Sequence, residues 1–130
     1  MKVLVCVRRN ATEGEQALAR DAVRRSDAKY GRGTAVLDTE IDWSRPDGEP
    51  EKFNQSISRV VPAFDVVVLI EQEDDYGHPA VGRGQAKCAE VALVNGRKVF
   101  AYRNDGFVPV RGVRVASPKQ WKGPYGAVVT

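Results

Sequence analysis

Residues able to bind an anion follow directly after the first apolar segment of the chain. The segment 2–7 is short and apolar, as in a buried strand, and it is followed by Arg8, Arg9 and Asn10. A capping-box sequence, Thr12-Glu13-Gly14-Glu15, then predicts a helix from about residue 13. Ligands of open α/β sheets bind at the carboxyl ends of strands, so these side chains can clamp a phosphate or carboxylate. The alternative is that both arginines are simply exposed surface residues.

A second group of polar residues follows another apolar segment, residues 66–70, which is typical of a buried parallel strand. Asp74 and Asp75 can accept hydrogen bonds from ribose hydroxyls or act as a base, and His78 can titrate near neutral pH. The alternative for Asp74 and Asp75 is a solvated acidic loop, and the alternative for His78 is an exposed turn residue before Pro79. A glycine-rich loop then leads into an alanine-rich helix, whose N-terminus suits an anionic ligand. The predicted ligand-binding residues here are Arg83, Gly84 and Gln85.

Several common sites are excluded by the residues that are missing. No Gly-x-Gly-x-x-Gly follows the first predicted strand, and no phosphate-binding P-loop is present. With two cysteines and one histidine, neither a disulfide framework nor a protein metal site is expected. Cys6 falls in the first predicted strand and is expected to be a small core residue. No cofactor is predicted.

Segments of strand and helix character alternate along the chain. Strands are expected at residues 2–7, within 34–43, at 65–71, at 98–102 and at 108–116, the last interrupted at 109 and 112. Helices are expected at 13–30, at 53–61 before Pro62, and from 81 or 85 to 95. The tail, 117–130, is expected to be irregular, with room for a short terminal strand. This order predicts a single α/β domain: a three-layer sandwich of about five mostly parallel strands, flavodoxin/Rossmann-like.

The stretch from Gly84 to Val99 resembles the nucleoside 2-deoxyribosyltransferase-like superfamily. That family begins a helix with Gly-Thr-x-x-Glu, continues with an alanine-rich stretch and enters a strand through Gly-Lys-Pro-Val. Here the chain reads Gly-Gln-Ala-Lys-Cys-Ala-Glu and then Gly-Arg-Lys-Val, and residues 63–70 are similar to the family's preceding strand. The resemblance covers about residues 60–102. It implies a nucleoside or nucleotide-like ligand and chemistry at an N-glycosidic bond.

The same stretch departs from the family at the position that performs catalysis. An ungapped alignment puts Cys88 where the family has its nucleophilic glutamate, and Gln85 where it has threonine. Glu90 lies two residues further, about 200° around the helix, so it should not reach the same place. Either the register shifts locally or the transferase chemistry is lost. If catalysis occurs, Glu90 and the Cys88 thiol are the only candidate nucleophiles. The alternative for Cys88 is a small packing residue.

Composition sets outer limits on function. The chain has 130 residues and 42% hydrophobic residues, which suits one globular domain. No apolar run approaches the roughly 20 residues of a membrane span, and a cytoplasmic location is expected. Residues 1–34, 35–82 and 83–130 carry net charges of +4, −8 and +7. Such blocks can attract phosphates or pair subunits of a homo-oligomer, and the alternative is an ordinary solvated surface of mixed charge. No nucleic-acid-binding motif accompanies the basic end.

Three hypotheses follow from the sequence. The chain binds a nucleoside or nucleotide and acts on an N-glycosidic bond, or it sequesters or senses such a ligand without catalysis. The third is an oligomerising interaction protein with no small ligand.

Overall fold

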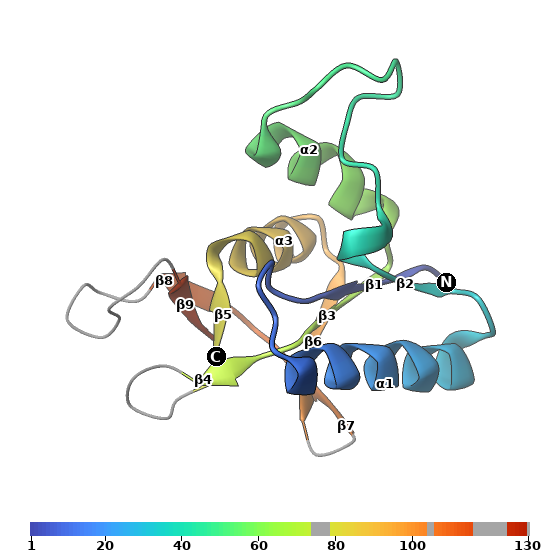
Figure 1. Ribbon diagram of the computed structural model, residues 1–130, viewed down its shortest axis with the longest axis vertical. Coiled ribbons are helices and arrows are strands. Elements are labelled where there is room, and N and C mark those ends of the chain that lie inside the picture. The colour runs from blue at the N-terminus through green and yellow to red at the C-terminus, as the bar shows by residue number, and fades with distance from the viewer. Residues whose placement is uncertain (74–78, 104–105, 116–124, 130) are drawn as a thin grey trace.

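A five-stranded sheet forms the centre of the fold in the computed structural model, which describes residues 1–73, 79–103, 106–115 and 125–129 (Figure 1). The strand order is β2-β1-β3-β6-β7; the first four strands are parallel, and β7 returns antiparallel beside β6. The strands are β1 (Val3–Cys6), β2 (Ala35–Leu37), β3 (Val66–Leu69), β6 (Lys98–Arg103) and β7 (Gly106–Pro109). This confirms the predicted sheet of about five mostly parallel strands.

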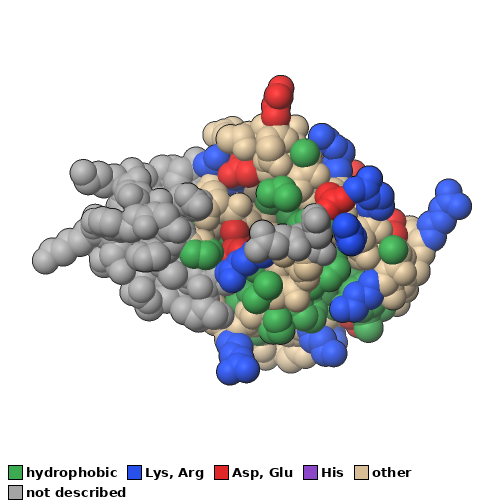
Figure 2. All heavy atoms as spheres, turned by 90° about the horizontal axis from the view of Figure 1, so that it is seen from below, with side chains coloured by type: hydrophobic (Ala, Val, Ile, Leu, Met, Phe, Trp, Pro, Cys, Tyr) green, Lys and Arg blue, Asp and Glu red, His purple; other side chains and the backbone are tan. Residues whose placement is uncertain are grey.

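Helices cover both faces of the sheet, which gives the predicted three layers (Figure 1). Helix α1 (Glu13–Tyr30) lies on one face against β1 and β2. Helices α2 (Phe53–Val60) and α3 (Arg83–Val94) lie on the other face. Figure 2 shows the α1 side of the molecule, where Lys and Arg side chains surround hydrophobic ones. None of the helices in the described part of the chain is both long and apolar enough to cross a membrane.

The central strands are apolar throughout because both of their faces are buried. In β1, Val3 and Val5 belong to the core under α1, whereas Leu4 and Cys6 belong to the core under α2 and α3. All four side chains are fully buried, so the expectation that Cys6 is a core residue is confirmed.

Local signals place the first two helices where the sequence predicts them. The Thr12 hydroxyl accepts from the Glu15 amide, and the Glu15 carboxylate accepts from the Thr12 amide, so the predicted capping box begins α1. Helix α2 ends at Val60 and passes into the 3-10 turn η2 (Val61–Ala63), because Pro62 cannot donate to an α-helical hydrogen bond.

A second, antiparallel sheet lies beside α3 and was not predicted. Its strand order is β4-β5-β9-β8, and its strands are β4 (Gln72–Glu73), β5 (Pro79–Gly82), β8 (Val113–Val115) and β9 (Tyr125–Val129). Strand β5 pairs with β9, which lies more than forty residues later in the chain. The sequence around β5 therefore does not indicate which segment it pairs with.

Three predicted boundaries are corrected by these pairings. Residues 108–116 are not one strand, because β7 and β8 belong to different sheets. The expected strand within 34–43 ends at Leu37 and continues as the 3-10 turn η1 (Asp38–Glu40). The expected glycine-rich loop is absent, since Gly82 ends β5 and Gly84 already lies in the first turn of α3.

Candidate functional site

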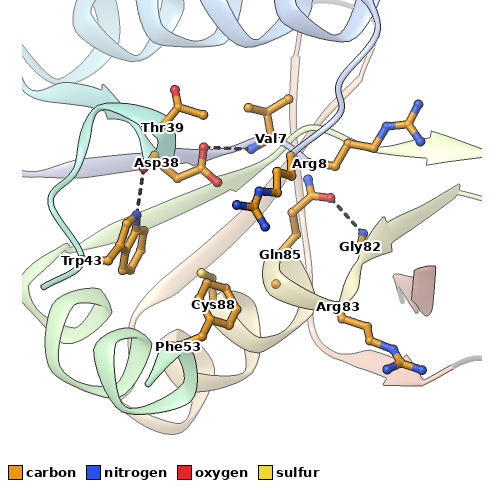
Figure 3. A pocket seen from close by; sticks show the side chains of 12 residues that line it. Val7, Arg8, Asp38, Thr39, Trp43, Phe53, Gly82, Arg83, Gln85 and Cys88 are labelled. Carbon is orange, nitrogen blue, oxygen red and sulfur yellow. Dashed lines mark hydrogen bonds between the residues drawn. The ribbon is translucent and has the colours of Figure 1, made fainter. Parts of the chain in front are cut away.

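A cavity of about 560 Å³ opens at the carboxyl ends of the parallel strands, beside the N-terminus of α3 (Figure 3). The strand order reverses here, because the chain goes from β1 to β2 on one side and later to β3 on the other. Doubly wound sheets bind their ligands at such a point. The lining residues come from four parts of the chain: Val7, Arg8 and Arg9; Asp38, Thr39 and Trp43; Phe53; and Gly82, Arg83, Gly84, Gln85 and Cys88.

Gln85 joins the N-terminus of α3 to the two strands that flank the reversal. Its Oε1 accepts from the Gly82 amide at 2.8 Å. Its Nε2 donates to the carbonyl oxygens of Cys6 and Ile70, at 3.0 and 2.7 Å. The side chain is only 3% exposed, so these bonds satisfy an amide that water cannot reach. Gln85 lines the cavity as expected, but its hydrogen bonds serve to position α3.

Two aromatic rings form one wall of the cavity. The ring centroids of Trp43 and Phe53 are 6.5 Å apart, with the planes tilted by 53°. The Trp43 indole N–H donates to the backbone carbonyl of Asp38 at 3.0 Å, which fixes the ring beside η1. The Phe53 ring lies on Gly84, where an added Cβ would be 3.0 Å from Cζ. Glycine at this position therefore lets the ring approach the helix.

Arg59 fixes the backbone that carries Trp43. Its guanidinium donates to the carbonyl oxygens of Trp43 and Ser44 and forms an ion pair with Glu51, with Nε and Oε2 2.9 Å apart. These bonds attach the loop before α2 to that helix, and they hold the backbone of Trp43 in the aromatic wall.

Asp38 contributes a partly buried carboxyl group to the cavity. It follows directly after β2, and its Oδ1 accepts from the Val7 amide at 3.4 Å, a long bond. Burial raises the pKa of Asp38 to about 6, against the lowering effect of backbone hydrogen bonds. A carboxyl group with a raised pKa in a cavity is a candidate functional group.

The three predicted arginines all line the cavity, but Arg8 is also bonded to the start of α1. Arg8 lines the cavity, and its Nε is bonded to Glu15 at 2.8 Å, so part of its guanidinium is held by the start of α1. Arg9 and Arg83 also line the cavity and are exposed. Asn10 is exposed and is not among the lining residues.

The two candidate nucleophiles lie on different sides of α3. Cys88 lines the cavity, with 4% of its surface exposed. Glu90 does not line it: its side chain is 62% exposed, and its carboxylate is 4.0 Å from the Lys87 ammonium. The helical geometry expected from the sequence thus holds, and Glu90 is not placed to attack a ligand in this cavity. Asp74, Asp75 and His78 lie outside the described residues.

Besides Val7 and Gly82, four lining residues were not predicted from the sequence as site residues: Asp38, Thr39, Trp43 and Phe53. For Asp38 a signal existed, since an acidic residue after the second strand is a known sugar-binding position in dinucleotide-binding sheets. The assignment of 34–43 to one strand hid it. Trp43 and Phe53 have no such signal, because only the folding of the following loop brings them to the cavity.

Metal binding has no support in the described ranges, where no group of three His, Cys, Asp or Glu side chains could hold an ion. No protein-family model, no curated protein and no solved structure matches this chain.

Proposed function

We propose that this protein binds a nucleoside or nucleotide in the cavity at the carboxyl ends of β1 and β2. One observation carries the proposal: an aromatic wall, a partly buried carboxyl group and the N-terminus of a helix with arginines beside it line the same cavity. These groups match the base, the sugar and the phosphate of such a ligand.

The aromatic wall suits a planar base. Phe53 remains 55% exposed although it packs on Gly84 and near Trp43, so part of its ring is available to a ligand. Stacking of a base on an aromatic ring contributes about 1–3 kcal/mol and tolerates different bases.

Asp38 and Thr39 suit the sugar. Both lie in η1, directly after β2, and both line the cavity. A carboxylate accepts hydrogen bonds from paired hydroxyl groups, and a threonine hydroxyl can donate or accept. Acidic residues at this position bind ribose in other doubly wound sheets, which is an analogy of fold.

The first turn of α3 suits a phosphate. The first amides of a helix have no partner within the helix, and the helix dipole adds positive potential. Arg83 lies in this turn and Arg9 on the neighbouring loop, so two guanidinium groups can supply bidentate hydrogen bonds.

Binding without N-glycosidic cleavage is the better-supported form of the proposal. The family that the sequence resembles uses a glutamate nucleophile, and Glu90 points away from this cavity. Cys88 lines the cavity but is buried, with only 4% of its surface exposed.

The test is calorimetric titration with AMP, adenosine and ribose 5-phosphate. We expect AMP to bind most tightly because it engages all three parts of the cavity. Phe53→Leu should weaken AMP and adenosine about tenfold and leave ribose 5-phosphate unchanged. Phe107→Leu, a change of the same type in β7, is the matched control. No binding of any of the three compounds would contradict the proposal.

Two further arms separate the phosphate contacts from catalysis. Arg9→Gln should weaken AMP about tenfold without affecting adenosine, whereas Arg32→Gln, an exposed arginine beyond α1, should change neither. Incubation with deoxyadenosine should release no adenine; release would restore the transferase or glycosidase hypothesis.

A further inference from the structure

The two cysteines belong to one buried core, and one of them also lines the cavity. Cys6 is the last residue of β1 and faces the core under α2 and α3. Cys88 belongs to the same core, on the side of α3 that faces the sheet. Both are free thiols and both are buried.

A hydrogen bond near the start of α3 and a shared core bring the two residues close together. The Gln85 amide donates to the Cys6 carbonyl at 3.0 Å, which brings the first turn of α3 to the end of β1. Cys88 follows Gln85 by three residues and therefore lies on the same side of the helix. The pKa of the Cys6 thiol is raised well above its usual range, first by a hydrogen bond with Cys88 and then by burial.

Access to the two sulfur atoms is unequal. Cys88 lines the cavity and retains 4% of its surface. Cys6 has no exposed surface. A reagent from solution would therefore meet Cys88 first.

We propose that Cys6 and Cys88 form an oxidation site, in which a small peroxide entering the cavity converts the two thiols into a disulfide. The Cys88 thiolate attacks one peroxide oxygen, the O–O bond breaks, and a sulfenic acid and one water are formed. The Cys6 sulfur then attacks the Cys88 sulfur, the S–O bond breaks, and the second water leaves. The two thiols lose two electrons and two protons, and hydrogen peroxide is reduced to two waters.

Two properties of this site follow from its position. The second step depends on the Cys6 thiolate, which burial disfavours, so disulfide formation should speed up as the pH rises. The bond would join β1 to α3 at the place where Gln85 already joins them, and would close a loop spanning most of the chain. The oxidised protein should therefore resist urea better than the reduced protein.

The experiment treats the folded, reduced protein with hydrogen peroxide and follows it by intact mass and peptide mapping. We expect a loss of two hydrogen atoms and one peptide pair linking Cys6 to Cys88, restored by dithiothreitol. The chain unfolded in urea should form this link at least tenfold more slowly, because the thiols are no longer held together.

Single variants test the order of events. In Cys6→Ala, Cys88 should stop at the sulfenic acid and be trapped by dimedone. In Cys88→Ala, Cys6 should stay reduced under the same treatment. Where Cys6→Ala does not fold, Cys6→Val replaces it as the cavity-filling variant. These results do not depend on nucleotide binding, so failure of the titrations with AMP leaves them intact.

Three results would overturn the proposal. They are a Cys88 sulfinic acid with Cys6 still free in the wild-type chain, a disulfide between two chains instead of within one, and equal rates of linkage in the folded and unfolded chain.

Discussion

Replacing Gln85 by alanine tests the hydrogen bonds that connect α3 to the sheet. The side chain makes three hydrogen bonds while 3% exposed, so its removal cannot be compensated fully by solvent. The Cys6 carbonyl still accepts from the Ile70 amide at 2.9 Å. The Gly82 amide and the Ile70 carbonyl, however, lose the partner that Gln85 supplies.

The expected loss of stability follows from these two groups. A buried polar group left without its partner costs about 1–3 kcal/mol. The better helix propensity of alanine recovers a few tenths of a kcal/mol. We therefore expect Gln85→Ala to lower the free energy of unfolding by about 3 kcal/mol. With a urea dependence of about 1.5 kcal/mol per molar, the midpoint should fall by about 2 M.

The measurement is urea unfolding followed by far-ultraviolet circular dichroism. Gln16→Ala is the matched control: Gln16 lies in the first turns of α1, is exposed, and donates one bond to the Ala11 carbonyl at 3.0 Å. Because water can replace that bond, the control should lose less than about 0.5 kcal/mol. An equal loss in the free energy of unfolding of the two variants would refute the inference that the Gln85 hydrogen bonds hold α3 on the sheet.

Three other predictions concern the cavity and the first helix. The Asp38 pKa is raised from 3.8 to about 6 in the folded state, so the wild type should lose about 2 kcal/mol relative to Asp38→Asn between pH 4 and pH 7. Urea unfolding across that pH range measures the difference, and parallel pH profiles would contradict it. Gly84→Ala should displace the Phe53 ring and weaken AMP binding severalfold in calorimetry, whereas Gly14→Ala, with 3.8 Å to its nearest neighbour, should raise stability without affecting AMP. Thr12→Ala should cost about 1 kcal/mol in urea unfolding through loss of the capping box, and an unchanged midpoint would show that the cap is dispensable.

The pH prediction has a fixed sign. Well below pH 3.8 Asp38 is protonated in both the folded and the unfolded chain, so it does not alter stability there. Above that pH the unfolded chain releases the proton first, and stability falls until the folded carboxyl has also ionised, near pH 6. The asparagine of the Asp38→Asn variant cannot ionise, so the free energy of unfolding of this variant should not decrease over the same pH range.

The alternation of helices and strands could be predicted because its signals are local. The apolar run at 66–70, the capping box at Thr12 and the proline at 62 each act within a few residues. The general position of the cavity followed from the same alternation, since the carboxyl ends of parallel strands share one edge of the sheet. The placement of Arg8, Arg9, Arg83, Gly84, Gln85 and Cys88 on the cavity lining agrees with that expectation.

Other features depended on contacts between distant parts of the chain. The second sheet pairs β5 with β9, and neither strand signals its partner. Trp43 lies at the cavity with its backbone carbonyl bonded to Arg59, sixteen residues later in the chain. Such contacts form when the tertiary structure brings separated segments together, so periodicity and spacing do not report them.

The sequence by itself determined the layered α/β architecture, the edge of the sheet where a ligand would bind and the helical phase that separates Glu90 from Cys88. The tertiary structure alone decided that Asp38 and two aromatic rings join that edge, that Gln85 connects α3 to the sheet, and that Cys6 and Cys88 share one core. The physical reason is the range of the interactions: hydrophobic period and capping act over one or two helical turns, whereas a cavity is made of side chains from four separated segments.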